Sequence, residues 1–203
     1  MEYLIFQPDK LNAPLPPFIL DAEEERQAER RGGAFRVIRT LLKLELERRT
    51  GIPAQDIHFE TGPHGKPLFA PQPFNISHSG NCLCMAFHSR DVGVDVEKMR
   101  PRNFDKLAAQ FMSPELLEHF RAGGCREEDF FSAWCVAEAL VKHAGDTIWN
   151  ARHYPFLIQD GIVCPTYEQA PQVELFTPMA GYRGAVAYTA GATCLTCKLP
   201  QSG

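Results

Sequence analysis

Apolar residues recur along this chain with two different periods, and the two periods predict a mixture of helices and strands. Spacing of three and four residues predicts long helices over 35–46 and about 127–143, and shorter ones over 104–111 and 114–120. Shorter runs, rich in apolar residues or alternating them with polar ones, predict strands at 3–7, 57–60, 67–69, 74–77, 82–88, 92–97, 154–158, 173–176, 184–188 and 193–197. The chain is therefore expected to be an α+β protein.

Residues that favour helix ends mark the boundaries of these helices. Asp21 is placed to cap a further helix, whose first turn is acidic as the helix dipole favours. The pair Gly32-Gly33 should interrupt or kink that helix. Ser113 supplies a cap before a first-turn proline, while Gly51 and Gly145 are stop signals for the two long helices.

The chain divides into two pieces of similar make-up. Each runs from a long helix into several strands, and a boundary near residue 90 gives an N-terminal α+β half, 1–90, and a C-terminal α+β half, 91–203. Nowhere does an apolar run approach the roughly 20 residues of a membrane helix, and residues 1–7 lack the basic start of a secretion signal. We therefore expect a cytoplasmic protein without membrane contact.

Composition excludes several classes of protein. With 203 residues and 44% hydrophobic content the chain can bury a core, which argues against wholesale disorder. The net charge of −4 argues against general nucleic-acid binding, although arginines cluster between residues 26 and 39. The seven cysteines are odd in number and scattered, as expected of thiols in a reducing compartment. Cys194 and Cys197 form an isolated CxxC, for which core packing is a better interpretation than a zinc or redox role.

The segment Gly93-Val94-Asp95-Val96-Glu97 places two carboxylates on one face of a predicted strand. Side chains alternate across a strand, so the valines face the other way. Two carboxylates on one face are half of an oxygen-ligand site for Mg²⁺, or simply a solvated face. Burying the pair would be costly without a cation or a basic partner nearby.

The predicted helix 127–143 carries an acid and a base one turn apart. Glu138 and Lys142 are four residues apart and share a face of the helix, most of whose other positions are apolar. They form either an exposed ion pair on a core helix, or a metal ligand or general base beside a lysine that neutralises a phosphate. Periodicity does not choose between these interpretations.

A third polar group lies in Phe74-Asn75-Ile76-Ser77-His78-Ser79-Gly80, where His78 to Gly80 is expected to turn the chain. Ser77 and His78 at a strand end are suited to phosphate oxygens. A Ser-His-Asp hydrolase is weakly supported, because adjacent strand residues point apart and no Gly-x-Ser-x-Gly segment is present. Upstream, Lys66 lies in Gly65-Lys66-Pro67, where an exposed loop lysine is the simplest interpretation.

Taken in order, four of these segments resemble the signature segments of the Sfp-type 4′-phosphopantetheinyl transferases. They are Gly65-Lys66-Pro67, Phe74 to Gly80, Gly93 to Glu97 and Trp134-x-x-x-Glu138-Ala139-x-x-Lys142, and Arg39-Thr40-Leu41-Leu42 resembles a helix motif near the family's N-terminus. The resemblance covers about residues 39–142 and implies two similar α+β halves related by a pseudo-twofold. Coenzyme A and Mg²⁺ would bind between the halves.

Carried over residue by residue, the resemblance makes Asp95, Glu97 and Glu138 the Mg²⁺ ligands. Lys142 would pair with the transferred phosphate or the leaving group, and Glu138 or a metal-bound water would accept the proton of the attacking hydroxyl. Five positions would contact coenzyme A: Arg39, Thr40, Lys66, Ser77 and His78. One departure is Ala137, where the family usually has lysine, so a cation is missing from a site for pyrophosphate.

The activity implied is transfer of 4′-phosphopantetheine from coenzyme A to a serine of an acyl or peptidyl carrier protein, releasing adenosine 3′,5′-bisphosphate. The partners implied are coenzyme A and the carrier protein, with no nucleic acid and no membrane, and a monomer is expected. The main alternative is a non-catalytic module of the same fold that binds coenzyme A or a carrier protein, because fold does not fix function. A third option is a metal-dependent phosphohydrolase, which would consume coenzyme A with no carrier protein present.

Overall fold

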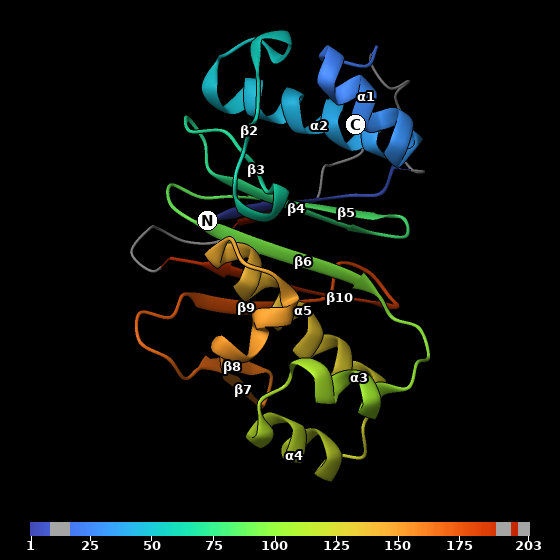
Figure 1. The fold of residues 1–203 in the computed structure, drawn as a ribbon, viewed down its shortest axis with the longest axis vertical. Helices are drawn as coiled ribbons and strands as arrows, with labels where there is room; N and C mark the ends of the chain where they lie inside the picture. The colour runs from blue at the N-terminus through green and yellow to red at the C-terminus, as the bar shows by residue number, and fades with distance from the viewer. Residues whose placement is uncertain (9–16, 190–195, 199–203) are drawn as a thin grey trace.

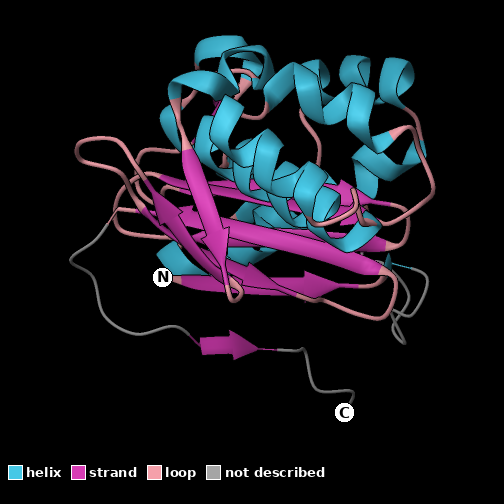
Figure 2. Ribbon diagram, turned by 90° about the horizontal axis from the view of Figure 1, so that it is seen from below, coloured by secondary structure: helices cyan, strands magenta, loops and turns pink. Residues whose placement is uncertain are grey.

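Two sheets form the centre of the molecule, with helices at both ends of its long axis (Figure 1). The computed structural model describes residues 1–8 and 17–189, and the backbone of 196–198. Most of the helical segments lie on one side of the strands (Figure 2). The α+β fold class is confirmed, whereas the pseudo-twofold and the boundary near residue 90 stay predictions.

The first sheet contains the N-terminal strand of the chain. Its order is β11-β1-β5-β4, and its strands are β1 (Glu2–Phe6), β4 (Phe74–Ser79), β5 (Cys82–Phe87) and β11 (Thr196–Lys198). Strand β5 runs antiparallel to β1 and β4, and β11 runs parallel to β1. Helix α2 (Gly33–Thr50) contributes Leu42 and Leu46 to a buried cluster with Leu83 and Met85, so this helix covers the sheet.

The second sheet carries the segment predicted to hold the carboxylates. Its order is β6-β10-β9, all antiparallel, with β6 (Val92–Lys98), β9 (Gln172–Phe176) and β10 (Tyr182–Tyr188). Helix α5 (Glu127–Ala144) packs on it through a buried cluster that includes Val136, Leu140 and Ala185. Another buried cluster, with Tyr3, Cys84, Val94 and Val186 among its members, joins the two sheets.

Smaller elements complete the fold. Helices α1 (Ala22–Arg31) and α2 lie at one end in Figure 1, and α3 (Phe104–Phe111) and α4 (Pro114–Ala122) lie at the other. Two hairpins add β2 (Glu60–Thr61) with β3 (Pro67–Leu68), and β7 (Phe156–Gln159) with β8 (Ile162–Pro165). Short 3₁₀ turns occupy Ala54–Asp56, Pro63–Gly65 and Ile148–His153.

The predicted helix boundaries are confirmed. The Asp21 carboxylate accepts hydrogen bonds from the backbone N–H groups of Glu23 and Glu24. In turn the Glu24 carboxylate accepts a hydrogen bond from the backbone N–H of Asp21, which completes a capping box. Gly32 separates α1 from α2. Gly51 and Gly145 end α2 and α5 in the left-handed conformation, at φ 74° and 72°.

Three strand predictions need correction. Of the predicted strand 57–60 only Glu60 lies in a strand, because Ile57 and Phe59 instead pack into the core under α2. Strand β4 continues to Ser79, so the chain turns at Gly80 rather than at His78. Strand β8 was not predicted, although Asp160-Gly161, both at positive φ, is a strong hairpin signal.

Two further predictions concern the C-terminal CxxC and membrane spanning. Cys194, half of the isolated CxxC, lies outside the described residues, as does most of the predicted strand 193–197. Among the helices that are described, none is both long enough and apolar enough to span a bilayer.

Candidate functional site

The two carboxylates of β6 face helix α5. Asp95 pairs with Ala185 and Glu97 with Arg183 in β10, and Ala185 belongs to the cluster that packs against α5. Val94 and Val96 are fully buried against the other sheet. The period of two along β6 therefore separates an acidic face from an apolar one, as predicted, and leaves Asp95 only 3% exposed.

Helix α5 brings its acid and its base to this face. The Lys142 Nζ donates to Asp95 Oδ1 at 2.7 Å and lies 4.0 Å from Glu138 Oε2. The close packing depends on Gly93, since a Cβ there would lie 2.1 Å from the carbonyl oxygen of Ala139 in α5. Two pairs of predicted site residues, distant from each other in the sequence, thus converge where β6 meets α5: Asp95 with Glu97, and Glu138 with Lys142.

Lys142 is a charged group held by oxygen atoms. Its ammonium also donates to the Val94 carbonyl at 3.3 Å and to Ser77 Oγ at 3.4 Å. Burial by itself would lower the pKa of Lys142, but the carboxylates of Asp95 and Glu138 raise it above its usual value. The side chain therefore stays cationic over the physiological range while remaining 26% exposed.

Burial and mutual repulsion both raise the pKa values of the surrounding carboxyl groups. Burial raises the pKa of Glu138, and the charges of Asp95 and Glu97 raise it further, against the lowering effect of Lys142. Burial and the Asp95 charge likewise raise the pKa of Glu97, against the Ser79 hydrogen bond. A cation placed among these groups would relieve the repulsion.

The donor set suits a hard divalent cation. Asp95 Oδ2 is buried without a hydrogen-bond partner among the described residues, and carboxylate oxygens are the ligands that Mg²⁺ prefers. Among the described residues, no group of three or more His, Cys, Asp and Glu side chains is already close enough to hold a metal ion. The chemistry of the ligands therefore fits the metal, and their closure around one stays a prediction.

Strand β4 supplies polar side chains on the same side as the carboxylates. Ser77 Oγ donates to Asp95 Oδ1 at 2.8 Å, and Ser79 Oγ donates to Glu97 Oε2 at 2.7 Å. Asn75 Oδ1 accepts the backbone N–H of Val94 at 2.8 Å. Neither Ser79 nor Asn75 was predicted to take part in the site, although the alternation of polar residues along 75–79 is a visible signal in the sequence.

The residues predicted to contact coenzyme A are not gathered in one place. Ser77 lies at the carboxylates, whereas exposed His78 lines a cleft with Val37 and Ile38 of α2. Lys66 Nζ donates to the carbonyl oxygens of Lys142 at 2.6 Å and Val92 at 3.4 Å. It therefore ties its loop to the last turn of α5, where cations stabilise the helix.

Arg39 and Thr40 are buried in α2 and have internal partners. The Arg39 guanidinium lies 3.4 Å from Glu24 Oε1 and stacks on the ring of Phe59. The Thr40 hydroxyl accepts the backbone N–H of Ile19 at 3.2 Å. Both residues hold the N-terminal segment and α1 against α2 in this structure, and their predicted contact with the coenzyme stays untested.

Ala137, at the position where a lysine was expected, is buried at 1% exposure in the core around α5. A lysine here would bury an ammonium among apolar groups, which is costly. Lys142 is therefore the better candidate for the cation that Ala137 lacks, because its ammonium forms an ion pair with Asp95.

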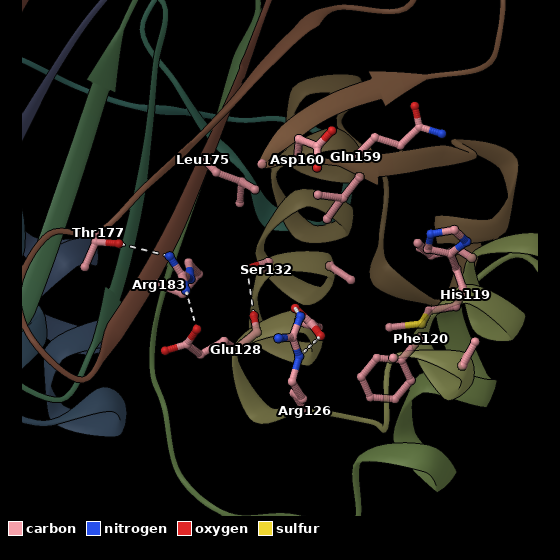
Figure 3. A pocket seen from close by; sticks show the side chains of 18 of the residues that line it. His119, Phe120, Arg126, Glu128, Ser132, Gln159, Asp160, Leu175, Thr177 and Arg183 are labelled. Atoms are coloured by element: carbon pink, nitrogen blue, oxygen red, sulfur yellow. Dashed lines mark hydrogen bonds and ion pairs between the residues drawn. The ribbon is translucent and has the colours of Figure 1, made fainter.

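A large cavity is lined in part by the start of α5. It has a volume of about 1040 Å³ between α4, the start of α5 and the turn of the β7–β8 hairpin, and residues of β9 and β10 also line it. Figure 3 shows Arg183 pointing toward Glu128 and Thr177 at one side of the cavity. None of the predicted site residues is among the described residues that line it. The converging charges, rather than the volume, mark the candidate site.

Comparison with known proteins agrees with the motif pattern. Residues 91–183, which contain the β6 carboxylates and α5, match the model of the 4′-phosphopantetheinyl transferase superfamily. The 4′-phosphopantetheinyl transferase AcpT of Escherichia coli O157:H7 is 34% identical over 147 residues, which cover 68% of this chain and 69% of that protein. The chain belongs to the 4′-phosphopantetheinyl transferase superfamily.

Within this superfamily the resemblance to the Sfp type is confirmed. The 4′-phosphopantetheinyl transferase Sfp of Bacillus subtilis strain 168 is 32% identical over 110 residues, which cover 52% of the chain and 49% of Sfp. The 4′-phosphopantetheinyl transferase psf-1 of Bacillus pumilus is 31% identical over 144 residues, 66% of the chain and 61% of psf-1. The chain thus spans about half the length of several of the relatives it matches.

Proposed function

We propose that this chain transfers the 4′-phosphopantetheine group of coenzyme A to a serine of an acyl or peptidyl carrier protein. The observation that carries the proposal is the meeting of Asp95, Glu97, Glu138 and Lys142 between β6 and α5, inside the segment that the superfamily model matches. The names of the relatives, all 4′-phosphopantetheinyl transferases, support the same reaction.

Charge is the main contribution of the site to this chemistry. The serine oxygen forms a bond to the β-phosphorus of coenzyme A, and the bond from that phosphorus to adenosine 3′,5′-bisphosphate breaks. Lys142, which stays cationic, pairs with phosphate oxygens as their charge is redistributed. A Mg²⁺ ion held by Asp95, Glu97 and Glu138 would neutralise the pyrophosphate and stabilise the departing phosphate.

Glu138 is proposed to accept the proton of the serine hydroxyl. Its side chain is 19% exposed, and burial together with the neighbouring carboxylates raises its pKa, which makes it a stronger base than an exposed glutamate. Arg39, Thr40, Lys66, Ser77 and His78 are retained as proposed contacts of coenzyme A. For Arg39, Thr40 and Lys66 this requires exchange of the internal contacts described above.

The same proposal includes the setting of the protein. We infer that the two halves 1–90 and 91–203 bind the coenzyme between them, and that the chain acts as a monomer in the cytoplasm. Neither a nucleic acid nor a membrane takes part in the proposed reaction.

The test is the intact mass of an apo acyl carrier protein after incubation with this chain, coenzyme A and Mg²⁺. A gain of one phosphopantetheine group that disappears with EDTA supports the transferase and its need for metal. Glu138→Gln, which keeps the shape of the side chain but removes the base, should abolish the gain. Binding of coenzyme A without any gain on several carriers would favour the non-catalytic module instead.

A further inference from the structure

Strands β4 and β6 are joined by side chains in place of backbone hydrogen bonds. In its own sheet β6 has β10 on one side only, so the N–H groups on its other edge need partners elsewhere. The N–H groups of Val94, Val96 and Lys98 donate to Asn75 Oδ1, Ser77 Oγ and Ser79 Oγ, at 2.8, 3.2 and 3.1 Å. The offset is 19 residues at each step, so the two strands run parallel in a fixed register.

The two serines make a second contact that Asn75 does not share. A hydroxyl has one hydrogen to donate and lone pairs with which to accept. Ser77 gives its hydrogen to Asp95 and Ser79 gives its hydrogen to Glu97. Each hydroxyl therefore bridges the carboxylate of one β6 residue and the N–H of the next. At Asn75 the corresponding β6 residue is Gly93, which has no carboxylate to hold.

The bridge at Ser79 matters more than the one at Ser77 for orientation. Asp95 is short, only 3% exposed, and also held by the Lys142 ammonium at 2.7 Å. Glu97 is longer, has more rotatable bonds and is only half-buried, so its carboxylate has more freedom to lose. Ser79, itself 9% exposed, fixes one oxygen of that carboxylate through a 2.7 Å hydrogen bond.

We propose that Ser79 is a positioning residue, whose hydroxyl holds the Glu97 carboxylate in the orientation required of a metal ligand. The inference rests on the proposed function, because it assigns Ser79 a task only if Glu97 binds the cation. Outer hydrogen-bond partners of metal ligands typically change metal affinity by about 10- to 100-fold when removed. Loss of the Ser79 hydroxyl is therefore expected to weaken binding of a divalent cation by about tenfold or more.

The test compares Ser79→Thr with Ser79→Val, two side chains of nearly equal shape that differ in the hydroxyl. Binding of Mn²⁺ alone to each purified full-length variant is followed by electron paramagnetic resonance, and folding is checked by thermal unfolding. Ser79→Thr is expected to bind Mn²⁺ with an affinity close to that of the wild-type chain, and Ser79→Val is expected to bind it about tenfold more weakly. Asn75→Ala removes the side chain that accepts the Val94 N–H and touches no carboxylate. This variant is expected to unfold at a lower temperature and to keep its Mn²⁺ affinity.

Three results would overturn the inference, and they are distinguishable. Equal Mn²⁺ affinity of Ser79→Thr and Ser79→Val, in a chain that binds Mn²⁺, overturns the role of Ser79 and leaves the proposed function standing. Equal weakening by Asn75→Ala and Ser79→Val attributes the effect to strand docking alone and overturns it as well. A wild-type chain that binds no Mn²⁺ overturns both this inference and the proposed metal site.

Discussion

Among single residues, the ion pair between Asp95 and Lys142 has the largest consequence. Both groups are largely removed from water, and each is surrounded by atoms that suit its charge. Removing one partner of such a pair leaves the other charge uncompensated, which costs more than the pair itself contributes. The site is therefore expected to tolerate few changes at either position.

Asp95→Asn keeps the shape of the side chain and removes its charge. Carrier modification should fall by at least about 100-fold, because a proposed metal ligand and the partner of Lys142 are lost together. The free energy of unfolding should fall by roughly 3 kcal/mol in urea denaturation. Asp105→Asn, an exposed residue paired with Arg121, is the matched control and should change neither quantity. Full activity of Asp95→Asn would remove Asp95 from the proposed metal site.

The lowered pKa of His143 should make the free energy of unfolding depend on pH. Burial lowers its pKa below 6.5, Lys66 and His88 lower it further, and Asp91 acts in the opposite direction. The unfolded chain therefore binds a proton at higher pH than the folded one, so stability is lost as pH falls through 6.5 toward the folded pKa. The loss from this residue cannot exceed about 1.4 kcal/mol per pH unit.

The matched variant is His143→Gln, which can keep the hydrogen bond that His143 Nε2 makes with Thr189 Oγ1. Urea denaturation at pH 7 and pH 5 should show a smaller acid-induced loss of stability in the variant than in the wild-type chain. An identical loss in both proteins would show that His143 titrates alike in the folded and unfolded states.

Between elements, the contact of α5 with β6 is the one that builds the site. It depends on Gly93, where a side chain would meet the backbone of Ala139 and His143 rather than a movable group. A helix backbone does not yield locally as a side chain does, so any added atom must move the helix.

Gly93→Ala should therefore displace α5 from β6 and separate Lys142 from Asp95. We expect a loss of several kcal/mol in the free energy of unfolding and little remaining carrier modification. The control is Gly33→Ala at the start of α2, where an added Cβ meets nothing within 4 Å and should be tolerated. Wild-type stability of Gly93→Ala would show that the helix and strand are less tightly packed than described.

For the whole molecule, ligand binding should be visible as stabilisation. A ligand that binds only the folded chain adds about 2.7 kcal/mol at a concentration 100 times its Kd. For a chain of 203 residues this corresponds to a rise in Tm of roughly 5–10 °C. Coenzyme A with Mg²⁺ should raise Tm by this order, and EDTA should remove the part due to the metal. No shift at saturating concentrations would contradict the proposed binding of both.

Much of the fold was predictable because its signals are local. Asp21, Ser113 and Gly145 mark helix ends through hydrogen bonds within a few residues of each, and all three were assigned correctly. Ile57 and Phe59 were assigned to a strand because apolar runs are ambiguous, and the core beneath α2 decided otherwise.

The candidate site was predictable in its members more than in its geometry. Motif order pointed to the Asp95 strand and the Glu138 helix, and the alternation along 93–97 placed both carboxylates on one face. Nothing local indicated that Lys142 would bond to Asp95, or that buried Ala137 would face the core, because both depend on how α5 settles on β6.

By itself the sequence determined the class of fold, the helix boundaries and the family, since periodicity, capping and motif order are properties of short segments. Only the tertiary structure decided that Ser77 and Ser79 bridge β4 to the carboxylates of β6. It also decided that the Lys66 ammonium donates to a carbonyl oxygen in the last, C-terminal turn of α5. These contacts join residues between 18 and 76 positions apart, and a hydrogen bond of that range exists only after the core has fixed both partners.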